Sequence, residues 1–299
     1  MMNETTIDET SISAKFMLGK FECTVVSDGP FTLGSPSKAF GENSADEVTR
    51  ILAELSLPTD SVNLQQNMLI VNTGRRRILF DAGSGRSPDF GAKAFGQSTG
   101  HMLKSMAKAG ISPDEIDVIA ITHAHPDHCW GLTDPSGKAI YKNATVLISE
   151  AEFDHWMSPA ALDPSRSAAA RFIAQGAQAN LSPYIDQIAF VDDGDDPIEG
   201  VTALLAAGHS PGHTLYQIES EGDKLLHWGD LVHHPVLLAK PDLGFVFDFD
   251  GAQAVRTRLK VLEKAASENT KIFSCHLDFP GIGHLSRTQG SYEWRSALF

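Results

Sequence analysis

Three histidines and one aspartate lie within six consecutive positions, from His123 to His128, in the order His-Ala-His-Pro-Asp-His. Unpaired polar groups are costly to bury, so a cluster this dense is either exposed to solvent or bound to a ligand. The apolar run at 117–122 before the cluster predicts a buried strand. On an extended chain His123 and His125 point the same way, and Asp127 and His128 follow where the strand ends. We therefore predict a metal site at a strand end rather than a solvated polar loop.

Three more side chains of the kind that bind metals follow short apolar runs later in the chain, at His209, Asp230 and His276. His209 lies in a loop rich in Gly and Pro, which mark a sharp turn that can present an imidazole. Binding sites are usually built where strands end at one rim of a sheet. Each of these residues alone is more often structural, but together with the first cluster they predict one shared site.

Apolar runs and amphipathic segments predict strands in two blocks, each followed by helices. The predicted strands cover 21–27, 68–72, 77–81, 117–122, 145–149, 187–191, 201–206, 214–219, 224–228 and 271–276. The predicted helices cover 100–109, 150–157, 166–178 and 252–266, the last with Asp250 as its N-cap. This order fits two sheets stacked face to face with helices outside.

Four motifs together resemble the metallo-β-lactamase-fold hydrolase superfamily. They are His-x-His-x-Asp-His at 123–128, Gly-His-Ser-Pro-Gly-His at 208–213, a strand ending at Asp230 and a last strand ending at His276. The resemblance extends from about Phe21 to the end of the chain. It implies an α/β fold, an αββα sandwich of two mixed β-sheets flanked by helices.

The resemblance also implies a ligand set for two metal ions. By it, the first ion is held by His123, His125 and His209, the second by Asp127, His128 and His276, and Asp230 bridges both. Asp81 matches an aspartate that supports the site in this superfamily without binding metal. His213, the second histidine of its loop, is expected to be a packing residue.

Five imidazoles and two carboxylates without a thiolate form a ligand set that suits zinc, and also manganese, cobalt or iron. Two such ions roughly 3.5–4 Å apart lower the pKa of a bridging water toward about 7. We therefore predict a hydrolase in which a bridging hydroxide attacks a carbonyl carbon or a phosphorus. Asp127, a ligand with a spare carboxylate oxygen, is the predicted catalytic group that moves the proton.

Three further segments resemble the branch of the superfamily that holds methyl parathion hydrolase and related lactonases, at 229–235, 248–250 and 279–284. The favoured substrate is a lactone or carboxylic ester of the N-acyl homoserine lactone type. Phosphotriester hydrolysis is the alternative, and thioester hydrolysis fits the segment 279–284 less well. A scaffold protein with structural zinc is disfavoured, because structural sites are closed, four-coordinate and usually rich in cysteine.

Aromatic and imidazole side chains near the ligands are the expected lining of a substrate pocket, which suits a flat or acyl substrate. The predicted substrate-binding residues are Phe95, Trp156, His233 and Phe279. His233 falls three residues after Asp230, where some relatives place a Tyr that contacts the lactone. His234 and His284 are alternative substrate contacts, or partners that orient the ligands.

Composition restricts the partners of the chain. Thirty-eight acidic and 24 basic residues among 299 give a net charge of −14, which disfavours nucleic acid because phosphate contacts dominate its binding. No apolar run approaches the length of a membrane span, and the first residues lack the basic and apolar regions of a signal peptide. The expected partner is therefore a small-molecule substrate.

Three cysteines, Cys23, Cys129 and Cys275, form an odd and sparse set that indicates a reducing compartment, so we expect a cytoplasmic protein. Cys129 and Cys275 are each next to a ligand histidine but should point away from the site, as small buried packing residues. Residues 1–20 are expected to be a polar arm that packs on a partner subunit, with a homodimer as the expected state, and 21–299 to be one hydrolase domain.

Overall fold

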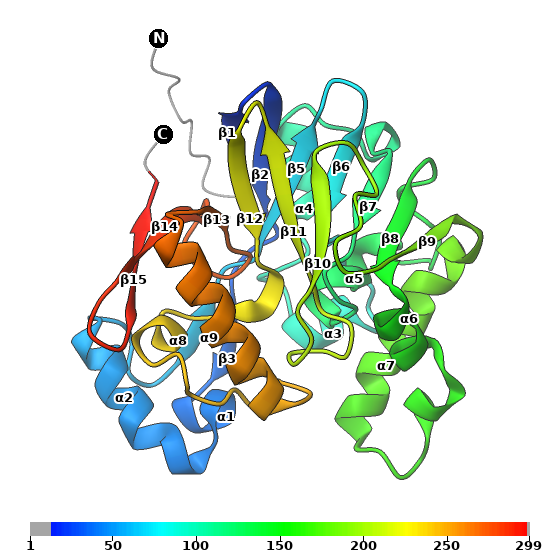
Figure 1. Cartoon of the computed structure of the whole chain (residues 1–299). Helices are drawn as coiled ribbons and strands as arrows, with labels where there is room; N and C mark the ends of the chain where they lie inside the picture. The colour runs from blue at the N-terminus through cyan, green and yellow to red at the C-terminus, as the bar shows by residue number, and fades with distance from the viewer. Residues whose placement is uncertain (1–12, 298–299) are drawn as a thin grey trace.

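The larger of two stacked sheets has seven strands in the part of the chain that the computed structural model describes, residues 13–297 (Figure 1). In spatial order they are β1 (Ser13–Leu18), β2 (Phe21–Ser27), β5 (Asn67–Asn72), β6 (Arg77–Phe80), β7 (Val118–Ala120), β8 (Thr145–Ser149) and β9 (Ile188–Val191). Pairing is antiparallel from β1 to β6 and parallel from β6 to β9. The sheet is therefore mixed, as predicted.

The second sheet has six strands and is also mixed, because β12 and β13 pair in parallel and the other neighbours are antiparallel. Its strands are β10 (Val201–Leu205), β11 (Thr214–Ser220), β12 (Asp223–His227), β13 (Lys271–Phe273), β14 (Ile282–Arg287) and β15 (Tyr292–Ser296). A separate two-stranded antiparallel sheet is formed by β3 (Phe31–Gly34) and β4 (Val62–Leu64).

Helices cover the outer faces of both sheets, which confirms the αββα architecture (Figure 1). On the first sheet these are α4 (Met102–Lys108), α5 (Pro126–Cys129), α6 (Glu150–Met157) and α7 (Ala168–Leu181); on the second, α1 (Pro36–Phe40), α2 (Ala45–Glu54), α8 (Val236–Ala239) and α9 (Gly251–Ser267). The short α3 (Gly91–Phe95) lies beside β3, where Phe95 contacts Phe31. No helix within the described range is long and apolar enough to cross a membrane.

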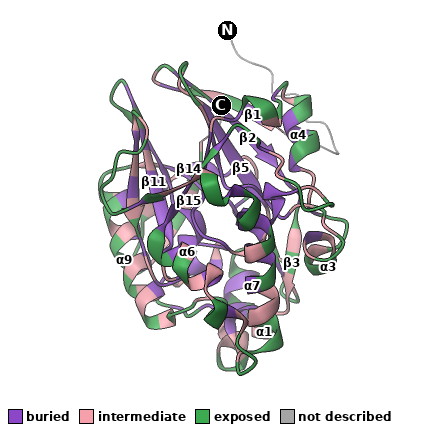
Figure 2. Ribbon diagram, turned by 90° about the vertical axis from the view of Figure 1, so that its right-hand side faces the viewer, coloured by how far each residue is buried: buried purple, intermediate pink, exposed green. Residues whose placement is uncertain are grey.

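The central strands β5, β6 and β7 are buried on both faces, which explains why they read as continuous apolar runs (Figure 2). In β5, Leu69 and Val71 belong to the cluster between the sheets, whereas Met68 and Ile70 belong to the cluster under the helices of the first sheet. Side chains alternate between the two faces of a strand, so one apolar run supplies two cores.

Strand β1 lies within the arm that was expected at residues 1–20, and there the expectation differs from the structure. Ser13–Leu18 pairs with β2 in an antiparallel hairpin, and Leu18 is fully buried between the sheets. A turn at Gly19, with φ of 54°, closes this hairpin. Residues 1–12 lie outside the described residues, so an arm there, and one domain over 21–299, stay predictions.

The strands predicted to end at or directly before His123, Asp230 and His276 all end earlier, and β12 ends at His227. β7 ends at Ala120: the amide of Ile121 still donates to the carbonyl of Leu147 in β8 (2.9 Å), but that of Thr122 donates to the side chain of Asp81 (2.8 Å) rather than to a strand. β13 ends at Phe273, and the carbonyl oxygen of Cys275 accepts from the amide of Asn67 in the first sheet (2.8 Å). The ligand residues therefore lie in loops beyond the strands.

Candidate dinuclear metal site

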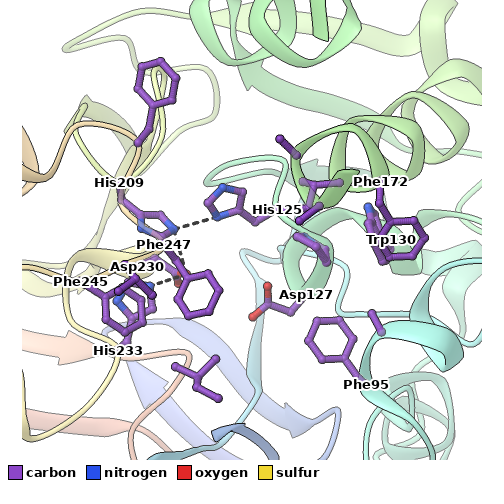
Figure 3. A pocket seen from close by; sticks show the side chains of 18 of the residues that line it. Phe95, His125, Asp127, Trp130, Phe172, His209, Asp230, His233, Phe245 and Phe247 are labelled. Carbon is purple, nitrogen blue, oxygen red and sulfur yellow. Dashed lines mark hydrogen bonds and ion pairs between the residues drawn. The ribbon is translucent and has the colours of Figure 1, made fainter. Parts of the chain in front are cut away.

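Four loops that follow β7, β10, β12 and β13 meet at one end of the sandwich, near α5 and β3 (Figures 1 and 3). All seven predicted ligands lie there in two adjoining groups. The first group is His123, His125, His209 and Asp230, and the second is Asp127, His128 and His276. The structure thus brings together residues that are separated by more than 150 positions in the sequence.

The first group has the spacing of a tetrahedral metal site. His209 Nε2 lies 2.9 Å from His125 Nδ1 and 3.2 Å from His123 Nε2. Asp230 Oδ2 lies 3.3 Å from His209 Nε2 and 3.5 Å from His123 Nε2. A tetrahedron with metal–ligand bonds of about 2.0–2.1 Å has edges of about 3.3–3.4 Å. The donor atoms therefore fit a divalent ion between them.

The second group shares Asp230 with the first, but through the other oxygen. Asp230 Oδ1 lies 3.0 Å from His276 Nε2 and 3.2 Å from His128 Nε2, and Asp127 Oδ2 lies 3.5 Å from each of these nitrogens. These two nitrogens and Asp230 Oδ1 are buried and have no hydrogen-bond partner among the described residues. Buried polar atoms are normally paired, so this arrangement fits a second ion bridged to the first by Asp230.

Most of the ligand imidazoles bind a protein group through the nitrogen that faces away from the site. His128 Nδ1 lies 2.8 Å from Asp81 Oδ2, His276 Nδ1 donates to the carbonyl of Gln65 (2.9 Å), and His123 Nδ1 lies 3.0 Å from Thr122 Oγ1. Such partners fix the orientation of a ligand ring. Asp81 therefore has the supporting position that the resemblance implied.

His209 has a partner that the sequence did not reveal. Its Nδ1 lies 3.0 Å from Asp248 Oδ1, and Asp248 Oδ2 lies 3.3 Å from the guanidinium of the fully buried Arg258 in α9. Asp248 lies two residues before Asp250, the predicted N-cap, and only the side chain of Asp250 caps α9. No local pattern indicated the contact with His209.

His213, which was expected to be a packing residue, makes two hydrogen bonds with its ring. Its Nδ1 donates to the carbonyl of Ala206 (3.2 Å), and its Nε2 accepts the amide N–H of Asp230 (3.0 Å). Burial and the neighbouring His209 lower the pKa of His213 to about 3, which keeps the ring neutral and able to accept. His213 therefore holds the backbone of the bridging aspartate.

The carboxylates of the site are held in their charged form. Burial alone would raise the pKa of Asp127, but the imidazole of His128 and that of His276 lower it to about 2. The pKa of Asp230 is also well below its usual value, because four imidazoles outweigh the effect of burial. Two buried carboxylates that stay ionised give the site the negative charge that divalent cations require.

The two cysteines next to ligands are both fully buried. Cys129 Sγ faces the carbonyl of Ala124 (3.3 Å). Cys275 lies between the sheets, but its Sγ is closer to the site than expected, since it and ligand atoms of His128 and Asp230 all lie within 4.8 Å of one another. Burial raises the pKa of both thiols well above the usual value.

A cavity of about 450 Å³ opens onto both donor groups. Figure 3 shows aromatic rings on both sides of it, with Phe95, Trp130 and Phe172 facing Phe245 and Phe247 across the metal ligands. Phe31, Trp156 and Phe249 complete the ring-rich lining. The predicted pocket residues Phe95, Trp156 and His233 therefore all line this cavity.

His233 is oriented by the bridging ligand. Its Nε2 donates to Asp230 Oδ2 (3.0 Å), and its ring stacks on Phe245 with centroids 4.1 Å apart. Burial, in spite of the nearby Asp230, lowers the pKa of His233 to about 4, so the ring is neutral and has only that one proton. The imidazole thus contacts Asp230 and forms part of the pocket wall.

Three other predicted contacts lie elsewhere. Phe279 is half-buried against the cluster between the sheets, because the chain turns away from the site after His276 to enter β14. His234 Nδ1 accepts the amide of Val236 (3.3 Å), and His284 Nδ1 donates to the carbonyl of Asn269 (3.0 Å). None of the three is among the described residues that line the cavity, and contact of these residues with substrate stays a prediction that the cavity does not support.

A family model described as the metallo-beta-lactamase superfamily matches residues 62–276. AidC, a dizinc quorum-quenching lactonase solved with the product N-hexanoyl-L-homoserine, is similar in structure, with a TM-score of 0.89 and 30% identity over 98% of this chain and 99% of that one. The hydrolase AbOPH, of the beta-lactamase superfamily, gives a TM-score of 0.86 and 31% identity over 96% and 98% of the two chains.

Among curated proteins, Cleavage and polyadenylation specificity factor 73 of Drosophila melanogaster is 30% identical over 128 residues, 40% of this chain. The matched part spans only 18% of that much longer relative.

Proposed function

Because the chain belongs to the metallo-β-lactamase superfamily and is a metal-dependent hydrolase of that fold, we propose that it opens lactones or cleaves carboxylic esters with an apolar acyl chain. The observation that carries this proposal is the cavity of aromatic side chains that ends at the two donor groups. Each buried CH₂ of an acyl chain contributes about 0.8 kcal/mol, so such a cavity selects substrates by their apolar part. The similarity to a dizinc lactonase supports the same substrate class.

The predicted ligand set would hold two divalent ions, with His123, His125 and His209 on one, Asp127, His128 and His276 on the other, and Asp230 between them. When bound, the ions supply a water whose pKa is lowered toward about 7 and polarise the oxygen of the electrophile. Zinc is the proposed metal, since the donors are nitrogen and oxygen; manganese, cobalt and iron suit the same donors.

Asp127 is the proposed proton carrier. Its Oδ2 lies 3.5 Å from Nε2 of both His128 and His276, and Asp127 lines the cavity, so Oδ1 is the proposed atom that takes a proton and passes it to the leaving oxygen. His233 keeps Asp230 oriented through its Nε2 proton. The surrounding rings exclude water from the reacting groups, which strengthens the electrostatic interactions there.

The test compares kcat/KM for a long-chain N-acyl homoserine lactone and for methyl parathion on one metal-loaded preparation. A lactone value of about 10⁵ M⁻¹s⁻¹ or above, with a far lower phosphotriester value, is expected. The reverse ratio would make phosphotriester hydrolysis the main activity, and the aromatic cavity also suits such a substrate. Slow turnover of both would mean that the substrate class is wrong.

The proposal carries three further expectations about partners and location. A net charge of −14 disfavours nucleic acid as a substrate, whose phosphates require a basic surface. A homodimer is expected, and sedimentation of the full chain tests it. A reducing, cytoplasmic location is expected from three cysteines that are all free and buried in the structure.

A further inference from the structure

Glu152 is a fully buried carboxylate in α6 whose acceptor positions are all used by neutral donors. Its Oε1 accepts from the amide of Ala124 (2.9 Å) and from Trp156 Nε1 (2.6 Å). Its Oε2 accepts from Ser210 Oγ (2.6 Å) and from the amide of Gly212 (2.9 Å). A buried carboxylate without an ion pair is costly unless hydrogen bonds compensate it, and here four donors from four residues do so.

Two of the segments that Glu152 binds are the loops of the first donor group. Ala124 stands between His123 and His125, and its amide is fixed by Glu152. Ser210 directly follows His209. One carboxylate therefore joins the loops that carry all three imidazoles of this group, although those loops are more than 80 positions apart in the sequence.

The contact between α6 and the second of these loops is close enough to require glycine. A Cβ on Gly212 would lie 2.1 Å from Ser149 Oγ and 2.4 Å from the amide nitrogen of Glu152. Ser149 caps α6 and also donates to the carbonyl of Gly212 (2.7 Å). The first turn of α6 and the His209 loop are thus packed backbone against backbone.

The fourth donor, Trp156 Nε1, belongs to the wall of the substrate cavity. The Trp156 ring packs edge-on against His125, with centroids 5.6 Å apart and an interplanar angle of 72°. The same oxygen of Glu152 that accepts from this indole accepts from Ala124. The position of the cavity wall and the position of the first donor group therefore depend on one atom.

We propose that Glu152 is a positioning residue that sets the geometry of the first metal group and of the adjoining cavity wall together. The proposal rests on the dinuclear site of the proposed function but not on the identity of the substrate. It assigns no role to Glu152 in the second group, none of whose members, Asp127, His128 and His276, has a hydrogen bond to it.

Glu152→Gln tests this role because glutamine has the same shape but the wrong donors. An NH₂ group turned toward Ala124 and Trp156 loses both hydrogen bonds of that side, because neither N–H can accept. Turned the other way it loses the bond to Gly212, whereas the Ser210 hydroxyl can rotate to accept, so at least one buried donor is left unpaired in either orientation. Loss of a group that orients metal ligands typically weakens metal binding about 10–100-fold. We expect that loss at the first ion only.

The matched control is Asp28→Asn. Asp28 is also a buried carboxylate that accepts from neutral donors, the amide and hydroxyl of Ser84 and the amides of Met102 and Gly100. It should lower the melting temperature without changing the binding of either ion.

The experiment titrates metal-free full-length protein with Zn²⁺ against a chromophoric chelator and measures hydrogen exchange of the segments 123–125 and 209–213 in the metal-free state. For Glu152→Gln we expect one ion bound as in the wild type, the other bound about 10–100-fold more weakly, and faster exchange at the amides of Ala124 and Gly212. Unchanged affinity for both ions, or an equal loss at both, would overturn the proposal.

Ser210→Ala covers the case in which Glu152→Gln does not fold, since it removes one donor and leaves the carboxylate in place. A smaller but selective weakening of one ion supports the proposal, and a folded variant with wild-type binding of both ions contradicts it. If the selective loss is found in a protein that hydrolyses no lactone or ester, the proposed substrate fails and the role of Glu152 stands.

Discussion

A buried imidazole that binds metal through one nitrogen needs a partner for the other, and that partner decides which nitrogen faces the ion. His128 and His209 both have a carboxylate on Nδ1, from Asp81 and Asp248, and both present Nε2 to the site. His125 is the exception and presents Nδ1. Its role in the first group therefore depends on how its loop is held rather than on a carboxylate partner.

Asp248→Asn should weaken the first ion selectively. Asparagine can still accept from His209 Nδ1, but the charge is lost, and Arg258 is left buried without its carboxylate. An uncompensated buried charge costs about 3–5 kcal/mol, so the melting temperature should fall as well. Zinc titration should show about 10–100-fold weaker binding at one ion, with a matching fall in kcat/KM.

Asp250→Asn is the control for this variant, because Asp250 is exposed, lies two residues away and caps α9, a position where asparagine is equally favourable. It should leave metal binding and activity unchanged. Equal zinc affinities for Asp248→Asn and the wild type would show that Asp248 does not orient His209.

Elements whose residues form a local pattern were predictable from the sequence. Strands β2 and β8 and helix α6 have the predicted bounds, since each has a clear apolar run or a capping serine. Strands β1, β14 and β15 were missed because polar and apolar residues mix in them and each is partly exposed. Their structure depends on pairing with neighbours that a local window does not contain.

The same limit applies to the site. The residues proposed as its ligands could be found in the sequence because four of them lie within six positions and the others follow apolar runs, and the structure brings all seven together. The residues that hold the ligands could not: Glu152 bonds to Ser210 across 58 positions, and Asp248 to His209 across 39. A buried Glu or Arg in a helix has the same local signature as an exposed one, so Arg258 could be recognised only from the structure.

Gly229→Ala should disrupt the turn that follows β12. Gly229 has φ of 52°, and a Cβ there would lie 2.4 Å from His213 Nε2, the atom that accepts the amide of Asp230. The left-handed backbone costs roughly 1–2 kcal/mol for alanine, and the displaced His213 would move the bridging ligand as well. We expect kcat/KM to fall at least about 10-fold, in line with losses of groups that orient ligands.

Gly222→Ala separates the two effects, because Gly222 has φ of 89° but nothing within 4 Å of an added Cβ. This variant should lose some stability to backbone strain and keep its activity. If thermal unfolding and kcat/KM were the same for both alanine variants, the contact between Gly229 and His213 would have no part in the site.

The loop before α9 should select the acyl chain. Phe247 lines the cavity and its side chain is 46% exposed, so its truncation removes contact with substrate at little cost to the fold. Losing about 1 kcal/mol of apolar contact predicts a rise in KM of about 5-fold for a long-chain lactone, with kcat nearly unchanged. A short-chain lactone, which does not reach the ring, should show a smaller rise.

Phe190→Ala is the matched control, since Phe190 is 49% exposed on β9 and lies outside the cavity. It should leave KM unchanged for both chain lengths. A Phe247→Ala variant whose KM rose equally for both lactones would place Phe247 at the reacting end of the substrate instead.

At the scale of the whole molecule, the two halves of the sandwich each supply part of the site. His123, His125, Asp127 and His128 follow the first sheet, whereas His209 and Asp230 come from the second. Between the sheets the apolar cluster joins the halves, and at the rim Glu152 joins the loops of the first donor group, to which Asp230 and bound ions would add a further link. The ions are therefore expected to stabilise the contact between the two sheets as well as to take part in hydrolysis.

Metal removal should lower the melting temperature and abolish hydrolysis together. A ligand present at 100 times its Kd stabilises the folded state by about 2.7 kcal/mol, which corresponds to a shift of about 4–5 °C for a domain of this size. Calorimetry before and after treatment with a chelator measures the shift, and added Zn²⁺ should restore both properties.

Chelator already saturated with zinc is the control and should change neither the melting temperature nor the activity. A metal-free protein that lost its activity but melted at the same temperature would contradict this prediction. It would mean that the unpaired buried nitrogens of His128 and His276 do not destabilise the fold and that the ions do not link the sheets.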